Sequence, residues 1–281
     1  MTIPFLRALV AGSLALIMFA GRPAAQAPPP PVEALHQPFD EILDMYVRDG
    51  LVYYFALRQE RAKFDGYSRA LSAVTADTVS RWPRSQQLAY WINAYNTFVL
   101  QSVIDHYPIR GRSKDYPANS LRQVPGAFDR QTFKAGGRTV TLDGLERDVI
   151  AGFGDARALL ALGRGSMGGG RLKSEAYSSG RLEAQLNEMA REVVDRRELI
   201  KVDVAGSQLS VSPMFSWRES VFVTWADRAP SVYATRSPLE RAVLALIDPV
   251  LVPTEADFLR KNQFTMVFHD FDWRLNDLTG R

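Results

Sequence analysis

"RSQQLAYWINAYNTFVLQSVID", residues 84–105, is the stretch that decides the fold. Between Arg84 and Asp105 lie twenty residues without a charge, and apolar side chains recur among them at helical spacing. The opposite face is largely apolar as well, and a helix that is apolar nearly all round is a central helix or a membrane span. Its glutamines and asparagines argue against a span. We therefore expect a buried central helix.

Two asparagines of this helix, Asn93 and Asn96, lie three residues apart and therefore on one side of it. A buried side-chain amide must find hydrogen-bond partners, because leaving it unsatisfied costs about 1–3 kcal/mol. The two amides either fix the backbone of neighbouring loops or line a pocket and hold a ligand. Both alternatives remain open on the sequence alone.

Helices and strands are interleaved around this helix without regular βαβ alternation, which favours an α+β fold over a doubly wound sheet. Hairpins are predicted at 131–142 and 199–213, and further strands at 51–55, 157–162 and 263–273, forming a small, mostly antiparallel sheet. Helices are expected over 39–50, 58–74, 141–150, 179–199, 214–223, 238–247 and 253–261, with Thr141 as an N-cap and Pro253 as a first helical residue.

The first 27 of the 281 residues have the features of a secretory signal peptide. Arg7 precedes an apolar run over 8–20 that is too short to span a bilayer comfortably, and Ala25-Gln26-Ala27 offers a cleavage site. The alternative is an uncleaved anchor, which would be the chain's only contact with a membrane. Prolines predict a stiff spacer over 28–35, and 36–281 is predicted to be a single compact domain.

Charge and cysteine content exclude several function classes. The net charge of +3 is small and mixed along the chain, without a basic stripe, so no nucleic-acid partner is predicted. The chain has no cysteine, which removes disulfides, thiolate metal sites and thiol nucleophiles. We expect a periplasmic or secreted protein whose stability comes from its core alone.

The central helix also carries a family resemblance. "LAYWINAYNTFVL" resembles the W-I-N-x-Y-N helix of the domain of unknown function 547 family. Three later segments, "SLRQVPGAFDRQTFKAGGRTVTLDGLERDVI", "LSVSPMFSWRESVF" and "HDFDWRLND", follow in that family's order, the last resembling its closing Y-D-W-x-L-N. The resemblance covers residues 38–277 and implies one compact α+β domain without an established activity.

Residues 156–177, "ARALLALGRGSMGGGRLKSEAY", depart from that family. Many members carry H-F-A-L-N-C-x-S-x-x-C-P-P-L there. In this chain Leu159 stands in place of the His, and Arg164 and Gly169 in place of the two Cys. The chain therefore lacks the groups for the thiol chemistry that this motif suggests, and it resembles a variant branch in which a Gly/Arg loop replaced the Cys/His loop.

The same segment contains G-x-G-x-x-G at Gly163, Gly165 and Gly168. A dinucleotide site needs a strand before the glycines and a helix directly after them, but the next credible helix starts near residue 178, so no cofactor is predicted. The loop is either a structural connector, whose arginines pair with carboxylates such as Asp155 or Glu175, or an anion cradle of backbone N–H groups. The cradle would add the side chains of Arg164, Ser166, Arg171 and Lys173.

The three histidines give no clear site. His36 is expected to be solvated, and His106 to lie at the C-terminus of the central helix, where a cation is favourable. His269 and Asp270 are adjacent on a predicted strand and therefore face opposite sides. No H-E-x-x-H or comparable spacing occurs, so no metal site is predicted.

The favoured function is binding of a small anionic ligand or an envelope protein partner, without thiol catalysis. Asn93 and Asn96 would form the floor of the site and the 163–173 loop one wall. A scaffold with exposed aromatics, such as Trp217 or Trp225, is a third possibility.

The rival is a hydrolase acting on peptide or glycan substrates in the cell envelope. Such an enzyme needs an activating base within hydrogen-bond reach of its nucleophile, or a pair of carboxylates. Ser166 is the candidate nucleophile, and the carboxylates would come from Glu146, Asp148 and Glu175. No catalytic residue is assigned.

Overall fold

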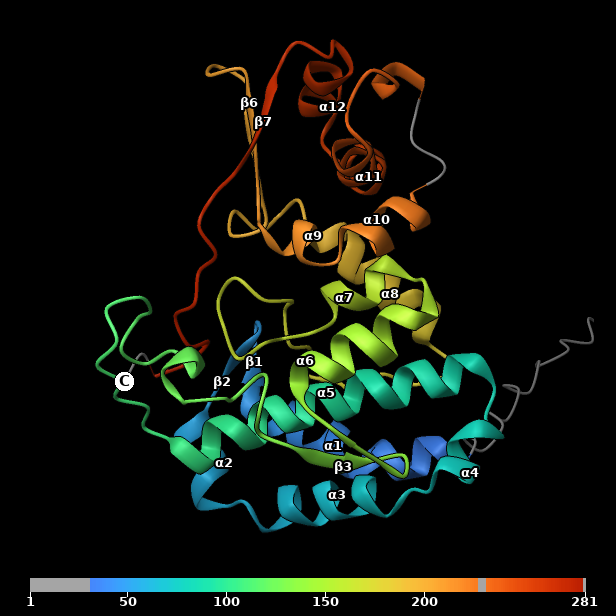
Figure 1. The fold of residues 1–281 in the computed structure, drawn as a ribbon, viewed down its shortest axis with the longest axis vertical. Coiled ribbons are helices and arrows are strands. Elements are labelled where there is room, and N and C mark those ends of the chain that lie inside the picture. The colour runs from blue at the N-terminus through green and yellow to red at the C-terminus, as the bar shows by residue number, and fades with distance from the viewer. Residues whose placement is uncertain (1–30, 227–230, 280–281) are drawn as a thin grey trace, which may run out of the picture.

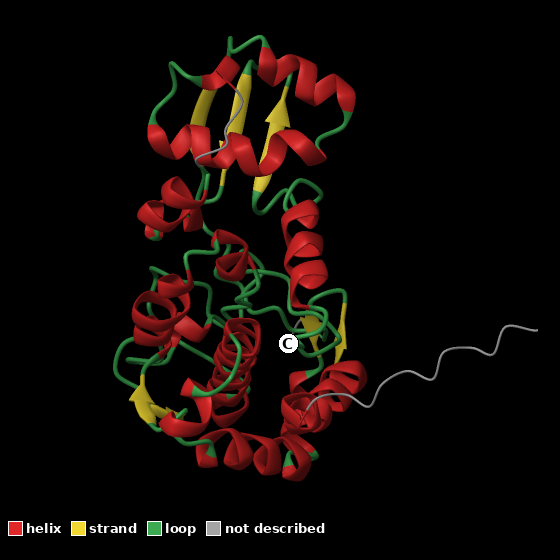
Figure 2. Cartoon of the chain, turned by 90° about the vertical axis from the view of Figure 1, so that its right-hand side faces the viewer, coloured by secondary structure: helices red, strands yellow, loops and turns green. Residues whose placement is uncertain are grey.

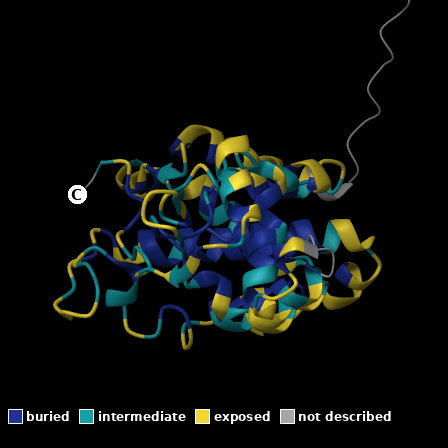
Figure 3. Cartoon of the chain, turned by 90° about the horizontal axis from the view of Figure 1, so that it is seen from above, coloured by how far each residue is buried: buried dark blue, intermediate teal, exposed yellow. Residues whose placement is uncertain are grey.

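The computed structural model describes residues 31–226 and 231–279, so the predicted signal peptide lies outside the described residues. At its centre is α5 (Arg84–His106), in which most side chains from Leu88 to Ile104 are buried. Figure 3 shows this buried centre enclosed by a shell of half-buried and exposed residues. The predicted central helix is confirmed. Among the described residues, no helix combines the length and apolar character that a membrane span requires.

Helices from the first part of the chain cover α5 (Figure 1). α1 (Pro31–Tyr46) packs on α3 (Ala62–Ala73), and both α2 (Tyr54–Gln59) and α3 contact α5. The rings of Phe39 and Tyr67 stack with centroids 4.8 Å apart, which fixes α1 against α3. Because α1 begins at Pro31, the end of the segment predicted as a spacer is helical.

Two short antiparallel hairpins lie beside these helices. They are β1 (Val47–Arg48) with β2 (Leu51–Val52), and β3 (Phe133–Ala135) with β4 (Arg138–Val140). The second confirms the hairpin predicted at 131–142, whereas the strand predicted at 51–55 is shorter, because the chain enters α2 at Tyr54. Gly136 in the β3–β4 turn has φ +54°, and a Cβ there would lie 2.5 Å from the Trp91 ring, so both the turn and the packing require glycine.

A three-stranded sheet forms one end of the molecule (Figure 2). β5 (Ile200–Asp203) and β6 (Gln208–Val211) form the predicted antiparallel hairpin, and β7 (Thr265–Phe268) adds to β6 in parallel. The β6–β7 pair is the exception to the antiparallel pattern among the named strands. The fold is therefore α+β, as predicted, with three small sheets in the described residues.

Residues 157–162 do not form the predicted buried strand. They lie largely in α7 (Ala156–Leu160), and the Asp155 carboxylate caps this helix by accepting the Arg157 N–H at 3.0 Å. A short apolar run is compatible with either element. Asp155 favours the helix, because its side chain accepts a hydrogen bond from a backbone amide at the helix N-terminus.

The remaining predicted helices are found, but with different bounds: the one predicted at 179–199 is about half as long, and the one predicted at 214–223 is divided into two helices. Thr141 caps α6 by accepting the Gly144 N–H at 3.0 Å, and α12 begins at Pro253, as predicted. The bounds are α4 (Ala76–Ser80), α6 (Leu142–Gly144), a π-helical segment (Leu145–Ile150), α8 (Leu182–Glu192), α9 (Met214–Trp217), α10 (Glu219–Trp225), α11 (Pro238–Ile247) and α12 (Pro253–Arg260), with single 3-10 turns at Leu121–Gln123, Ala151–Phe153, Ser231–Tyr233 and Asp248–Val250.

The chain after β7 returns to the first hairpin. The Val52 N–H donates to the Asn276 carbonyl at 2.8 Å. The Asn276 side chain accepts from the Tyr54 hydroxyl and donates to the Gly50 carbonyl, each at 2.8 Å. This return brings Trp273 back beside the helical part of the molecule.

Candidate functional site

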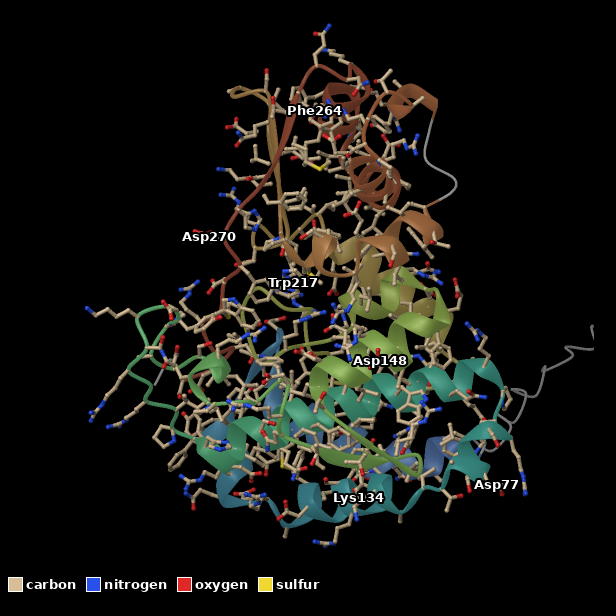
Figure 4. All side chains as sticks on the ribbon, viewed as in Figure 1. Asp77, Lys134, Asp148, Trp217, Phe264 and Asp270 are labelled. Atoms are coloured by element: carbon tan, nitrogen blue, oxygen red, sulfur yellow. The ribbon has the colours of Figure 1, made fainter. Side chains whose placement is uncertain are left out.

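A cavity of about 210 Å³ lies where the sheet-bearing end of the molecule meets the helices around α5. Trp217, which follows β6, marks this boundary in Figure 4. The walls of the cavity combine aromatic rings with more arginines than carboxylates. We call it the arginine cavity, and it is lined by Tyr95, Arg122, Phe128, Asp143, Glu146, Arg164, Trp217, Arg218 and Trp273.

The deepest polar contact of this cavity is a buried ion pair. A terminal guanidinium nitrogen of Arg164 lies 2.9 Å from one carboxylate oxygen of Glu146, and the two side chains are 3% and 5% exposed. Arg164 also donates to the carbonyls of Leu159 and Leu162. Burial opposes the charge on Arg164, but the Glu146 carboxylate outweighs it and holds the pKa of Arg164 above its ordinary value. Arg164 therefore keeps its charge in spite of its burial.

A second arginine approaches the same carboxylate from the other side. The Nε of Arg218 lies 3.4 Å from the second oxygen of Glu146, and its NH1 donates to the Trp217 carbonyl at 2.9 Å. That Nε is buried and makes no hydrogen bond within the described part of the chain. The single carboxylate of Glu146 thus lies between the guanidinium groups of Arg164 and Arg218, and it can balance the charge of only one of them.

The third arginine lies against two rings that contact each other edge-on, with centroids 5.8 Å apart. The guanidinium of Arg122 lies 4.4 Å from the ring centres of both Phe128 and Trp273, an arrangement that favours a cation over aromatic faces. No carboxylate of the described residues lies within ion-pair distance of it, and its buried Nε has no partner there. Trp273 stacks in turn on Trp217 at 5.8 Å, whose ring lies 5.6 Å from Arg164.

Tyr95 on α5 forms the floor of the cavity. Burial, followed by the charge of Glu146, raises the pKa of Tyr95 well above its ordinary value. Asp143 acts in the same direction, and Arg164 and Arg122 oppose it, so all four charges converge on this phenol. Tyr95 is therefore a neutral hydroxyl. The cavity as a whole can hold an anion through arginines and an apolar body through aromatic rings.

Asn93 and Asn96 lie outside this cavity, and their amides hold loop backbone. Asn93 donates to the Tyr177 carbonyl at 2.8 Å and accepts the Tyr177 N–H at 2.9 Å. Asn96 donates to the Ala161 carbonyl at 3.0 Å and accepts the Gly163 N–H at 2.9 Å. Each buried amide thus uses its donor and its acceptor to fix a loop on the central helix.

Ser166 and Arg171 line a separate cavity of about 170 Å³, which lies between residues 163–173, the glycine loop, and the first hairpin. The Ser166 hydroxyl is buried and has no hydrogen-bond partner among the described residues. Lys173 forms ion pairs with Glu188 at 2.6 Å and Glu192 at 2.7 Å on α8. Of the six predicted ligand-binding residues, the structure therefore places only Arg164 in the arginine cavity.

The glycine loop packs tightly against neighbouring backbone. A Cβ on Gly170 would lie 1.8 Å from the Leu160 carbonyl, and one on Gly169 would lie 2.2 Å from the Gly163 carbonyl. The loop follows a helix, α7, and so lacks the preceding strand of a dinucleotide fingerprint.

The expected pairing of the loop arginines with Asp155 or Glu175 is wrong for Arg164. Asp155 binds Arg157 at 2.7 Å, and Glu175 binds Arg181 at 2.6 Å. The π-helical segment after α6 instead brings Glu146 to Arg164.

The histidines make contacts with neutral partners. His36 is 2% exposed, so the expectation that it is solvated is wrong. Its Nδ1 lies 2.7 Å from the Tyr67 hydroxyl, and burial lowers the pKa of His36 to about 4. His106 at the end of α5 and His269 each lie within 3.0 Å of a backbone carbonyl. None of the three hydrogen-bonds a serine hydroxyl within the described residues, where no acidic or histidine cluster suits a metal either.

The carboxylates proposed for a hydrolase are not brought together. Glu146 faces the arginine cavity, whereas Asp148 forms an ion pair with Arg147 at 2.8 Å and lines a different cavity. Glu175 is held by Arg181. Trp217 and Trp225 are half-buried and packed on the core instead of standing exposed.

The family model described as "Protein of unknown function, DUF547" matches residues 79–194. This part of the chain is similar to that family, and we call residues 79–194 the DUF547 segment. The DUF547 segment contains α5, both members of the buried ion pair and the glycine loop. Neither the comparison with curated proteins nor that with solved structures finds a match.

The DUF547 segment supplies only part of the arginine cavity, because Trp217, Arg218 and Trp273 lie beyond residue 194. Sequence reasoning missed Arg122 and Asp143 as well as these three. A signal existed, since Arg122, Trp217 and Trp273 each lie in one of the three quoted segments that follow the central helix in the family's order.

Proposed function

We propose that the protein binds a small anionic ligand, with a carboxylate or phosphate group and an apolar body, in the arginine cavity. The observation that carries this proposal is the surplus of guanidinium groups around Glu146. Arg164 and Arg218 share that one carboxylate, at 2.9 Å and 3.4 Å. Arg122 has no ion-pair partner in the described residues, and the buried Nε atoms of Arg122 and Arg218 make no hydrogen bond there. An oxyanion in the cavity would supply the missing negative charge, because guanidinium groups bind carboxylate or phosphate in bidentate fashion.

The size and walls of the cavity support a ligand of metabolite size. Its volume of about 210 Å³ is below the roughly 300–1,000 Å³ typical of sites for drug-sized molecules. Phe128, Trp217 and Trp273 contribute apolar ring atoms to the cavity wall, against which the uncharged part of the ligand can pack.

We further propose that binding takes place outside the cytoplasm, in the periplasm or after secretion. The charged start, short apolar run and A-x-A site of residues 1–27 support this location. The hydrolase alternative gains no support from contacts, because the Ser166 hydroxyl has no hydrogen-bonded base among the described residues.

A thermal-shift screen of the purified protein tests the proposal, with phosphate, 3-phenylpropionate, nucleotides and acidic sugars as probes. We expect a rise in melting temperature with at least one anion, and its loss in the double variant Arg122→Met/Arg218→Met. Arg171→Met, in the neighbouring cavity, is the matched control and retains the rise. Loss of the rise in Arg171→Met alone would assign the anion to the glycine loop, and a flat panel would contradict the proposal.

A further inference from the structure

One acid of the arginine cavity remains unpaired. Asp143 lies in the first turn of α6, and its N–H donates to the Phe128 carbonyl at 2.9 Å, so its backbone is fixed at the cavity wall. Its half-buried carboxylate makes no ion pair or hydrogen bond among the described residues. A purely anionic ligand would therefore meet repulsion from Asp143 beside the attraction of the arginines.

The other acids near the cavity cannot take the place of Asp143 as a partner for a cation. Glu146 lies between Arg164 at 2.9 Å and Arg218 at 3.4 Å. Asp148, two residues further, pairs with Arg147 and lines a different cavity. The cavity therefore presents one free carboxylate and two guanidinium groups with unused donors.

A ligand that carries both charges on neighbouring atoms matches this arrangement. We propose that the arginine cavity recognises a free α-amino acid with an apolar or aromatic side chain, its carboxylate on Arg122 and Arg218 and its ammonium group on Asp143. This assignment rests on the proposed function and names its ligand class. The side chain would lie against Trp217 and Trp273, whose rings stack at 5.8 Å.

Tyr95 explains how the two charge-binding groups share one small ligand. Tyr95, Asp143 and Arg122 line the same cavity of about 210 Å³, and the phenol feels the charges of both the acid and the arginine. An α-amino acid separates its ammonium and carboxylate groups by a single carbon atom, and its charged end therefore spans a short distance. The neutral Tyr95 hydroxyl can accept from the ammonium or donate to the carboxylate.

Isothermal titration of the wild-type protein with three related probes tests the assignment. They are L-phenylalanine, 3-phenylpropionate, which lacks the ammonium group, and 2-phenylethylamine, which lacks the carboxylate. We expect L-phenylalanine to bind at least about tenfold more tightly than either analogue, which corresponds to about 1.4 kcal/mol. Asp143→Asn should lower the affinity for L-phenylalanine to that for 3-phenylpropionate, and should leave the affinity for 3-phenylpropionate unchanged or raise it. Asp77→Asn, in an exposed ion pair with Arg81 away from the cavity, is the control and should have no effect.

The outcomes separate this inference from the proposed function. Equal binding of L-phenylalanine and 3-phenylpropionate to the wild type, or binding of phosphate alone, overturns the amino-acid assignment and leaves anion binding intact. Failure of every anion to bind overturns both. If circular dichroism shows that Asp143→Asn does not fold, the affinities of the wild-type protein for the three probes are sufficient to test the assignment.

Discussion

Arg164 and Glu146 form an ion pair of 2.9 Å that is almost completely withdrawn from water. The pair joins the glycine loop to the π-helical segment after α6. No sequence pattern predicts this contact. It fixes one wall of the arginine cavity and takes up the only carboxylate that faces Arg218 within ion-pair distance among the described residues.

Removing either partner of this pair should destabilise the protein strongly. Glu146→Gln leaves the buried Arg164 charge uncompensated, and we expect the free energy of unfolding to fall by about 3–5 kcal/mol. Arg164→Met should have a similar effect. The double variant Glu146→Gln/Arg164→Met should lose clearly less than the sum of the two single losses, because no lone buried charge remains. Urea unfolding of all four proteins checks this, and strictly additive losses would contradict it.

Asn96 should matter for stability more than its neutral side chain suggests. Asn96→Ala removes the hydrogen bonds to the Ala161 carbonyl and the Gly163 N–H and leaves these groups unsatisfied next to the core. We expect a loss of about 2–4 kcal/mol in the free energy of unfolding. Ser85→Ala, at an exposed position of the same helix, should change it by less than about 0.5 kcal/mol. Similar values for the two variants would disprove the anchoring role.

Two glycines should respond in opposite ways to the same substitution. A Cβ on Gly170 would lie 1.8 Å from the Leu160 carbonyl, whereas one on Gly152 would meet nothing within 4 Å. Gly170→Ala should therefore cost about 2 kcal/mol or more through displaced backbone. Gly152→Ala should be neutral or stabilise by about 0.4–1 kcal/mol, because it restricts the unfolded chain. Thermal melts of both variants decide, and a stable Gly170→Ala protein would refute the close packing.

His36 should make stability depend on pH in the acidic range. Burial lowers its pKa from 6.5 to about 4, so between these values the unfolded chain binds a proton that the folded protein excludes. The free energy of unfolding should therefore fall as the pH drops from 6.5 to 4, by up to about 1.4 kcal/mol per pH unit from this group. Urea unfolding at pH 7 and pH 5 measures it. In His36→Gln the fall should be smaller, and an equal fall would point to other groups.

The sequence predicted the fold where one pattern dominated. The uncharged run of α5, the Gly136-Gly137 turn and the Thr141 cap each depend on neighbouring residues alone, and all three are confirmed. The apolar run over 157–162 was misassigned because its length suits a strand or a helix, although Asp155 directly before it is a helix-capping residue.

The site could be predicted only in fragments, because its charges meet across the fold. Arg164 was identified as a candidate, but Glu146 was considered only as a possible hydrolase carboxylate and not as its partner. Arg122 is held by Phe128 from its own loop and by Trp273 from the far end of the fold. No local periodicity encodes such a contact, since it depends on the path of the chain from β7 back to the first hairpin.

The hydrogen bond from the Asn276 side chain to the Gly50 carbonyl joins residues that are 226 positions apart. During synthesis at about 5–20 residues per second, the first hairpin therefore waits roughly 10–45 s for its partner to be made. The edge of this hairpin and the Tyr54 hydroxyl stay without their final contacts during that time. A ribosome-bound chain that ends before residue 276 should accordingly be a better target for chaperones and proteases than the finished protein.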